Sequence, residues 1–173
     1  VSTGKVELLY ADYEGRTFGG PNDIIFAADG SFWFTDYGKW TPDATRHGGL
    51  YHAGIDGKTL RQVAFGTCLN GVGLSPDGKR AYAAATAERW ILGFDTDPAA
   101  GRQQGEVLAN FTGRQHLDSM AIEASGVIAV HVCIIMSARF RLPLEALLAV
   151  PAGTALARMA GAVKSASRRG LPA

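Results

Sequence analysis

Three side chains with oxygen donors recur at equal spacing along the chain. Asn22, Asn70 and Asp118 lie 48 residues apart, and each begins a segment of similar composition. Amide carbonyls and carboxylates are hard oxygen ligands that suit Ca²⁺, or less well Mg²⁺ or Mn²⁺. If the fold brings the three together, they predict a metal site with positions open to a substrate. The alternative is that Asn and Asp begin these segments because both residues favour turns.

An internal repeat must supply the elements that position these side chains. Each candidate ligand is followed by a short apolar run, a turn ending in glycine, and a second apolar run: Phe32–Phe34, Ala81–Ala83 and Ile128–Val130. Two more strands fit in each of the first two units, at Gly49–Ile55, Thr59–Phe65, Trp90–Thr96 and Glu106–Phe111. Four short strands in about 40–50 residues are typical of a β-propeller blade. The segment Lys5–Ala11 is expected to be the last strand of a preceding blade.

Strand parity predicts which loops share a face with the candidate ligands. The loop between the second and third strands of a unit returns to the end where the first strand began. In the first unit this loop runs from Tyr37 to Gly48. Tyr37 and Trp40 are expected to wall a sugar-sized pocket, or alternatively to pack the loop onto the sheet. Arg46 is a candidate partner for a substrate carboxylate, with a solvated charge as the alternative.

Two histidines accompany this predicted face. His47 lies in the same loop as Tyr37, and His116 is two residues from Asp118, where it could assist proton transfer. An ordinary surface histidine is the alternative for both. Asp23 is expected to be structural rather than a ligand, because successive side chains of a strand point to opposite faces.

The composition excludes several classes of function. The net charge of +1 argues against a strongly basic nucleic-acid binder, and two cysteines cannot form a disulfide framework. No apolar run is long enough to span a bilayer, and no signal peptide is recognisable at the start of the sequence. We therefore expect a cytoplasmic protein that acts on a small molecule, with no nucleic acid, membrane or protein partner.

The chain divides into two different kinds of sequence. Residues 127–173 carry six basic residues, one acidic residue and eleven alanines, whereas 15 of the 16 aromatic residues precede them. We assign residues 1–132 to an incomplete β-propeller and residues 133–173 to an Ala/Arg-rich tail, partly helical or partly disordered. Leu142–Val150 and Thr154–Val163 are the predicted helices, separated by Pro151 and Gly153. A frameshift or truncation is one explanation of the tail, and an appended helix is the other.

Residues 4–130 resemble the SMP-30/gluconolactonase/luciferin-regenerating-enzyme family. The resemblance lies in Gly20-Pro21-Asn22-Asp23, in Asp29–Asp36 and in Asn70–Lys79. It implies an all-β fold that is part of a six-bladed β-propeller, with about 2.5–3 blades in this chain. It also implies a bound divalent cation, Ca²⁺ or another such as Mg²⁺, Mn²⁺ or Zn²⁺, and hydrolysis of a sugar lactone.

The resemblance also assigns roles to individual residues. It implies that Asn70 and Asp118 are metal ligands, that Asn22 is a ligand or a substrate contact, and that Asp118 is the catalytic base. The chain departs from the family pattern because no residue matches the glutamate ligand of the first blade, and because Ser119 stands where the family usually has glycine. We therefore expect activity to be absent or impaired. The alternatives are a non-catalytic propeller module and a phosphotriester hydrolase.

Overall fold

The computed structural model describes residues 4, 6–41, 44–46, 48–66, 68–113, 115–134 and 146–151. Within these ranges the protein consists of β-strands and their connections, with a short 3-10 helix, η1 (Pro98–Ala100). The all-β fold predicted from the sequence is therefore confirmed for the described part of the chain.

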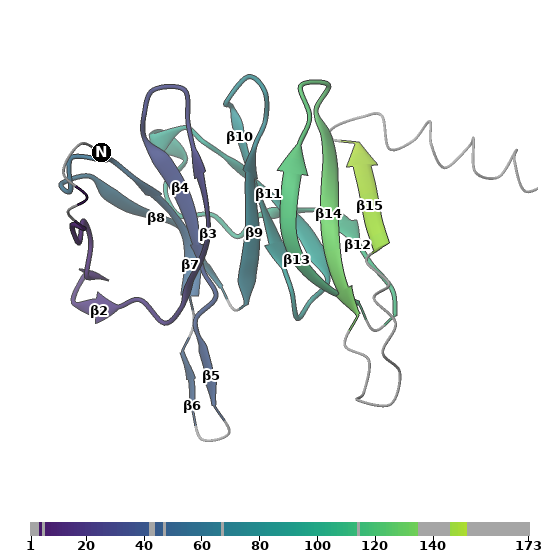
Figure 1. The fold of residues 1–173 in the computed structure, drawn as a ribbon, viewed down its shortest axis with the longest axis horizontal. Helices are drawn as coiled ribbons and strands as arrows, with labels where there is room; N and C mark the ends of the chain where they lie inside the picture. The colour runs from purple at the N-terminus through teal and green to yellow at the C-terminus, as the bar shows by residue number, and fades with distance from the viewer. Residues whose placement is uncertain are drawn as a thin grey trace, which may run out of the picture.

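Two four-stranded antiparallel sheets follow one another along the chain (Figure 1). The first sheet contains β3 (Pro21–Phe26), β4 (Phe32–Asp36), β7 (Gly48–Ala53) and β8 (Leu60–Gly66), in that order. The second contains β9 (Leu69–Leu74), β10 (Arg80–Ala85), β11 (Trp90–Asp95) and β12 (Glu106–Asn110). The β3–β4, β7–β8 and β9–β10 hairpins turn at Asp-Gly pairs, where Gly30, Gly57 and Gly78 take the positive φ that favours glycine. The strands predicted for the first two units are thus confirmed to within two residues at each end.

A third antiparallel sheet completes the described structure. It contains β13 (Gln115–Ile122), β14 (Val127–Ile134) and β15 (Ala146–Pro151). The helix predicted over Leu142–Val150 is wrong where it overlaps β15, because this apolar segment pairs with the edge of β14 instead. The second predicted helix, Thr154–Val163, lies outside the described residues. The domain boundary near residue 132 stays a prediction.

The segment before the first sheet also differs from expectation. Lys5 is outside the described residues, and residues 6–11 form no strand, so the predicted strand Lys5–Ala11 is wrong in this structure. A strand needs a neighbour with which to share a ladder, and this segment pairs with none of the described strands. The chain instead forms a small hairpin of β1 (Asp12–Tyr13) and β2 (Arg16–Thr17).

The first strands of the three sheets, β3, β9 and β13, stand side by side in Figure 1, and the outer strands splay away behind them. Apolar side chains fill the space between successive sheets. Successive side chains of β10 point to opposite faces of the second sheet. Ala81, Ala83 and Ala85 pack toward the first sheet in the core that contains Trp33, whereas Tyr82 packs with residues of the third sheet. The sheets therefore stack face to face around their first strands.

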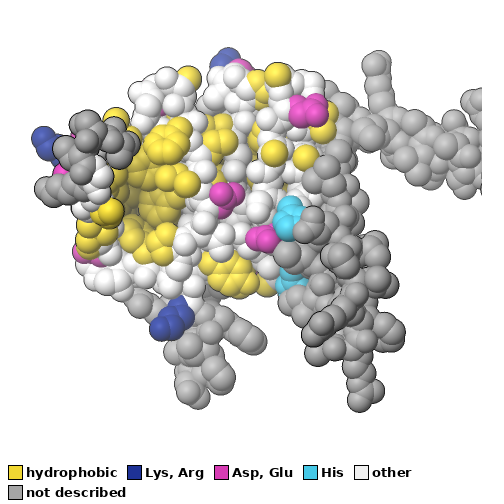
Figure 2. Space-filling view, viewed as in Figure 1, with side chains coloured by type: hydrophobic (Ala, Val, Ile, Leu, Met, Phe, Trp, Pro, Cys, Tyr) yellow, Lys and Arg dark blue, Asp and Glu magenta, His cyan; other side chains and the backbone are white. Residues whose placement is uncertain are grey.

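The outer face of the first sheet is apolar as well. Phe32, Phe34 and Tyr51 pack beneath Phe18 of the leading segment. Phe26 nevertheless keeps 64% of its surface exposed, and this side of the molecule shows a broad hydrophobic patch in Figure 2. The apolar surface of the sheet is therefore larger than the leading segment covers.

Asp36 fixes the leading segment to the end of β4. Its carboxylate accepts backbone N–H bonds from Gly19 (2.8 Å), Gly20 (2.6 Å) and Gly38 (3.0 Å). With 2% of its surface exposed, Asp36 is also among the most buried charged residues of the described chain. Asp36 therefore caps the turn that follows β4 and ties the leading segment to it.

We expect Asp36→Ala to lower the free energy of unfolding by about 3 kcal/mol, because each buried N–H left without an acceptor costs about 1–3 kcal/mol. Chemical denaturation followed by tryptophan fluorescence measures the loss. Asp77→Ala is the matched control, because Asp77 also accepts turn hydrogen bonds, from Ser75 and Lys79, but is exposed. An equal loss in the two variants would contradict the role given to Asp36.

Candidate functional site at the start of the three first strands

A β-bulge lies at the same place in each sheet. The register between the first and second strands shifts between Pro21 and Ile24 in β3 and between Leu117 and Met120 in β13. In the second sheet the shift places Asn70 and Gly71 opposite a single residue of β10. A bulge redirects the side chains that it contains and often lies beside a functional site. Asn22, Asn70 and Asp118 therefore occupy structurally equivalent bulges.

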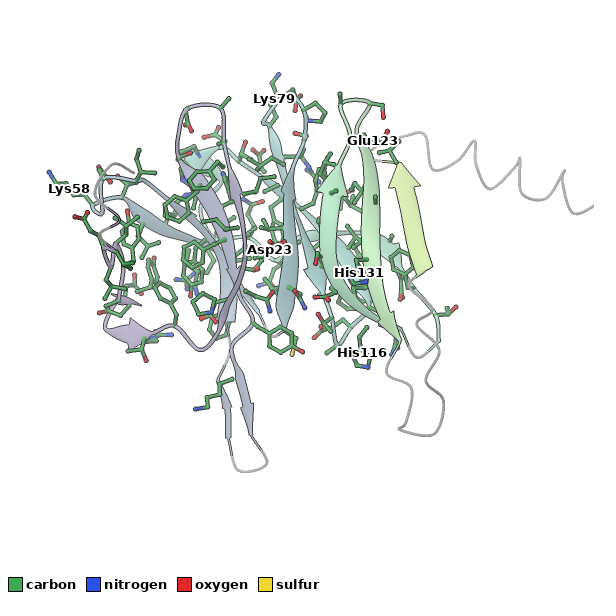
Figure 3. All side chains as sticks on the ribbon, viewed as in Figure 1. Asp23, Lys58, Lys79, His116, Glu123 and His131 are labelled. Atoms are coloured by element: carbon green, nitrogen blue, oxygen red, sulfur yellow. The ribbon has the colours of Figure 1, made fainter. Side chains whose placement is uncertain are left out.

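The residue opposite each bulge comes from the second strand of the same sheet. The three are Thr35, Ala84 and His131, as the flanking pairs of the ladders show. His131 lies with its Nδ1 3.6 Å from Oδ2 of Asp118, and both side chains are about one-third exposed. Figure 3 shows His131 on the side of the molecule that carries the first strands. The third bulge thus brings a carboxylate and an imidazole together.

Polar and close backbone contacts join the first strands to one another. The backbone N–H of Val72 in β9 donates to Oδ2 of Asp23 in β3 at 2.9 Å. A Cβ atom on Gly71 would lie 2.5 Å from the backbone oxygen of Asp118, so β9 and β13 meet backbone to backbone there. The structural role expected of Asp23 is confirmed, although the bulge interrupts the strand alternation on which that expectation depended.

Tyr37 and Cys68 lie at the end of the sheets where the first strands begin. The backbone N–H of Cys68 donates to the carbonyl of Tyr37 at 3.1 Å, and the two side chains are also hydrogen-bonded. Burial raises the pKa of Tyr37 to about 12, helped by this bond and by the negative charges of Glu88 and Asp118. Tyr37 therefore stays protonated at neutral pH and is a hydrogen-bond donor close to Asp118.

The structure places the predicted ligands as follows. Asn70 is 9% exposed, Asp118 is half-buried, and Asn22 is exposed. Asn22 lines a hollow of about 370 Å³, together with Phe18 and Phe34 on the outer side of β3. The negative charge of Asp118 acts on Tyr37, whereas the hollow that Asn22 lines contains neither of these two residues.

Three further predicted substrate contacts, Trp40, Arg46 and His47, have side chains outside the described part of the structure. Trp40 and Arg46 belong to the hairpin of β5 (Lys39–Thr41) and β6 (Ala44–Arg46). His47 lies outside the described residues. The hairpin extends from the end of β4, where Asp36 pairs with Pro21 at the start of β3. The loop thus lies at the end predicted from strand parity.

Two residues were missed by sequence reasoning, His131 beside Asp118 and Glu88, whose charge acts on Tyr37. His131, rather than His116, lies against the carboxylate. The repeat carries a signal for this position, because His131 follows the apolar run Ile128–Val130 as Thr35 follows Phe32–Phe34. Glu88 lies in the turn from β10 to β11, and the parity argument applied to the first unit would have placed this turn at the same end.

The donor chemistry of the site fits a hard divalent cation. In the described part of the chain, no three His, Cys, Asp or Glu side chains come close enough to hold a metal ion. A site at the bulges would therefore use amide oxygens from Asn22 and Asn70 with the single carboxylate of Asp118. Oxygen donors of this kind suit Ca²⁺ rather than softer metals.

Comparison with known proteins assigns the family. A profile described as the SMP-30/Gluconolactonase/LRE-like region matches residues 1–142. The chain belongs to this family. A gluconolactonase from Zymomonas mobilis is 29% identical in a match 106 positions long, which covers 55% of this chain and 30% of that protein. The resemblance stated from the sequence is therefore confirmed.

Solved structures show the same fold. A gluconolactonase from Xanthomonas campestris superposes with a TM-score of 0.63 at 26% identity, covering 76% of this chain and 49% of that one. Regucalcin from Agrobacterium tumefaciens, described as a calcium-binding protein, gives a TM-score of 0.52 at 23% identity, covering 65% and 38%. The chain thus spans about half the length of the first structure and less of the others.

Location in the cell is a separate question from the fold. Across the described ranges, no helix has the length and apolar character that a membrane crossing requires. The cytoplasmic location expected from the sequence stays a prediction.

The charges around Tyr37 give a testable titration. Removing a negative charge makes the phenolate less unfavourable, so Glu88→Gln and Asp118→Asn should each lower the pKa of Tyr37 from about 12. Tyrosinate absorbance recorded immediately after mixing with alkali measures this pKa. The Tyr37→Phe variant identifies which part of the absorbance change comes from Tyr37 rather than from the other tyrosines. Glu123→Gln, in an exposed turn of the third sheet, should leave the titration unchanged. No shift in either of the first two variants would contradict the coupling.

Proposed function

We propose that the chain carries part of the active site of a divalent-metal-dependent sugar lactone hydrolase. In this proposal the three sheets are successive blades of a six-bladed propeller, and β3, β9 and β13 line its central channel. The observation that carries the proposal is the equivalent bulge in each sheet, which holds Asn22, Asn70 or Asp118. Membership of a family that includes gluconolactonases supports the choice of substrate.

Asn70 and Asp118 are the proposed metal ligands, and Asn22 is either a third ligand or a substrate contact. Because Asn70 is buried, few water molecules or solvent ions can reach its amide oxygen and compete with a bound cation. When bound, a divalent cation supplies Lewis-acid polarisation of the substrate carbonyl and lowers the pKa of water. Ca²⁺ is the first candidate, with Mg²⁺, Mn²⁺ or Zn²⁺ as alternatives.

The chain's own groups can divide the proton transfers of lactone hydrolysis. The carboxylate of Asp118 accepts a proton from the attacking water, whose oxygen bonds to the carbonyl carbon. The ring C–O bond then breaks, and the ring oxygen takes up a proton to give the hydroxy acid. His131 lies 3.6 Å from the Asp118 carboxylate and can carry that proton onward.

Tyr37 is proposed to bind substrate rather than to act as a base. Its raised pKa keeps the phenol protonated, so it can donate a hydrogen bond to an oxygen of the substrate. Substrate contacts by Trp40, Arg46 and His47 stay predictions, because nothing described in the structure tests them.

Metal binding is the first test of this function. We expect calorimetric titration of the 173-residue chain with Ca²⁺ to show one site, and Asp118→Asn to weaken it at least tenfold, because site charge sets affinity for Ca²⁺. Asp77→Asn removes a charge from the exposed turn between β9 and β10 and should have no effect. Equal binding by the two variants would overturn the proposed site.

Turnover is the second test. The chain spans about half of the gluconolactonase to which it is structurally similar, so we expect its own lactone hydrolysis to be low. In a ring completed by fusion to further blades of the family, Asp118→Asn should reduce hydrolysis by about 10²–10⁴-fold, the usual contribution of a general base. Faster hydrolysis of a phosphotriester than of a lactone would change the substrate class, and no hydrolysis of either would favour the non-catalytic module.

A further inference from the structure

Two buried threonines, one at the end of each of two second strands, lie between neighbouring sheets. Thr35 lies in β4, the second strand of the first sheet, and is fully buried. Thr86 directly follows β10, the second strand of the second sheet, and is 5% exposed. Neither residue belongs to the proposed set of ligands, so the roles of their hydroxyl groups need an explanation.

Each threonine links the beginning of the first strand in its own sheet to the first strand of the next. The Thr35 hydroxyl accepts the backbone N–H of Asp23 at 3.3 Å and donates to the carbonyl of Asn70. The backbone N–H of Thr86 donates to the carbonyl of Cys68, directly before β9, at 3.0 Å. Its hydroxyl donates to the carbonyl of Leu117 in β13 at 2.7 Å.

The carbonyls that accept the two hydroxyl bonds lie in or directly beside the bulges. The carbonyl of Asn70 lies in the bulge of β9, and that of Leu117 directly precedes the bulge at Asp118 and Ser119. A bulge disrupts the ladder locally and leaves backbone groups that need other partners. The two hydroxyls therefore hold the backbone of the next sheet at or next to the candidate ligand.

We propose that Thr35 and Thr86 are positioning residues for the candidate metal ligands Asn70 and Asp118. The identity of the ligands rests on the proposed function, but the hydrogen bonds do not. Removing a group that orients a metal ligand typically weakens metal binding 10–100-fold. The proposal thus predicts that one methyl-for-hydroxyl replacement, at a residue outside the proposed ligand set, weakens metal binding without unfolding the chain.

Thr86→Val is the decisive variant because it keeps the shape of the side chain and removes the hydroxyl. We expect it to weaken Ca²⁺ binding by calorimetry about tenfold or more. Thr86→Ser, which keeps the hydroxyl, should restore affinity to within a few-fold of the unchanged chain. Thr96→Val is the matched control, since the Thr96 hydroxyl also donates to a carbonyl, that of Gly78 at 2.8 Å, at the opposite end of the second sheet.

A second measurement tests the positioning without metal. In the metal-free chain, Thr86→Val should shift the backbone amide NMR signals of Asp118 and Ser119, and Thr96→Val should leave them in place. Unchanged signals, or unchanged Ca²⁺ affinity in a chain that binds Ca²⁺, would overturn the proposal. Unfolding of Thr86→Val would also overturn it, because the hydroxyl would then serve the fold as a whole.

The two readouts separate this inference from the proposed function. If the unchanged chain binds no Ca²⁺ but Thr86→Val shifts the Asp118 signals, the proposed function fails and the positioning of the bulge stands. If the chain binds Ca²⁺ and Thr86→Val binds it equally well, the proposed function stands and the positioning role fails.

Discussion

The approach of β9 to β13 at Gly71 is the contact on which the geometry of the site depends. Any side chain there would bring its Cβ within 2.5 Å of the Asp118 backbone oxygen, so glycine permits the two strands to meet directly. Asn70 adjoins this contact on one strand, and Asp118 forms it on the other. Their separation is therefore set by backbone packing, which is stiffer than the side chains that it carries.

Where strands from separate sheets approach closely, their buried backbone N–H and C=O groups need hydrogen-bond partners. The described sheets share no ladder with one another, and each first strand is bulged where it meets its neighbour. Asp23, Thr35 and Thr86 meet this demand by bonding to backbone groups of the next sheet. Each of the bulges at Asn70 and Asp118 thus redirects a candidate ligand, and a neighbouring sheet holds the backbone in or directly beside it.

Sequence reasoning succeeded where local rules decide the structure. Asp-Gly turns and alternating apolar runs located the strands of the first two sheets, and the 48-residue spacing placed the three candidate ligands in equivalent positions. It failed where a neighbour decides, as in Lys5–Ala11, which pairs with none of the described strands, and Leu142–Val150, which meets the edge of β14. Nearness in sequence likewise favoured His116, although an antiparallel ladder brings His131 opposite Asp118.

The electrostatics of the site follow from the same arrangement. The turns that carry Tyr37 and Glu88 lie at the end where the first strands begin, so the charges of Glu88 and Asp118 both act on Tyr37. Burial and the two carboxylates oppose ionisation of Tyr37, which leaves a neutral donor beside an acidic group. The neutral donor and the acidic charge come from different sheets, because Tyr37 follows β4 of the first, Glu88 follows β10 of the second and Asp118 lies in β13 of the third. The stacking of the sheets around their first strands is therefore what brings the three groups into one electrostatic environment.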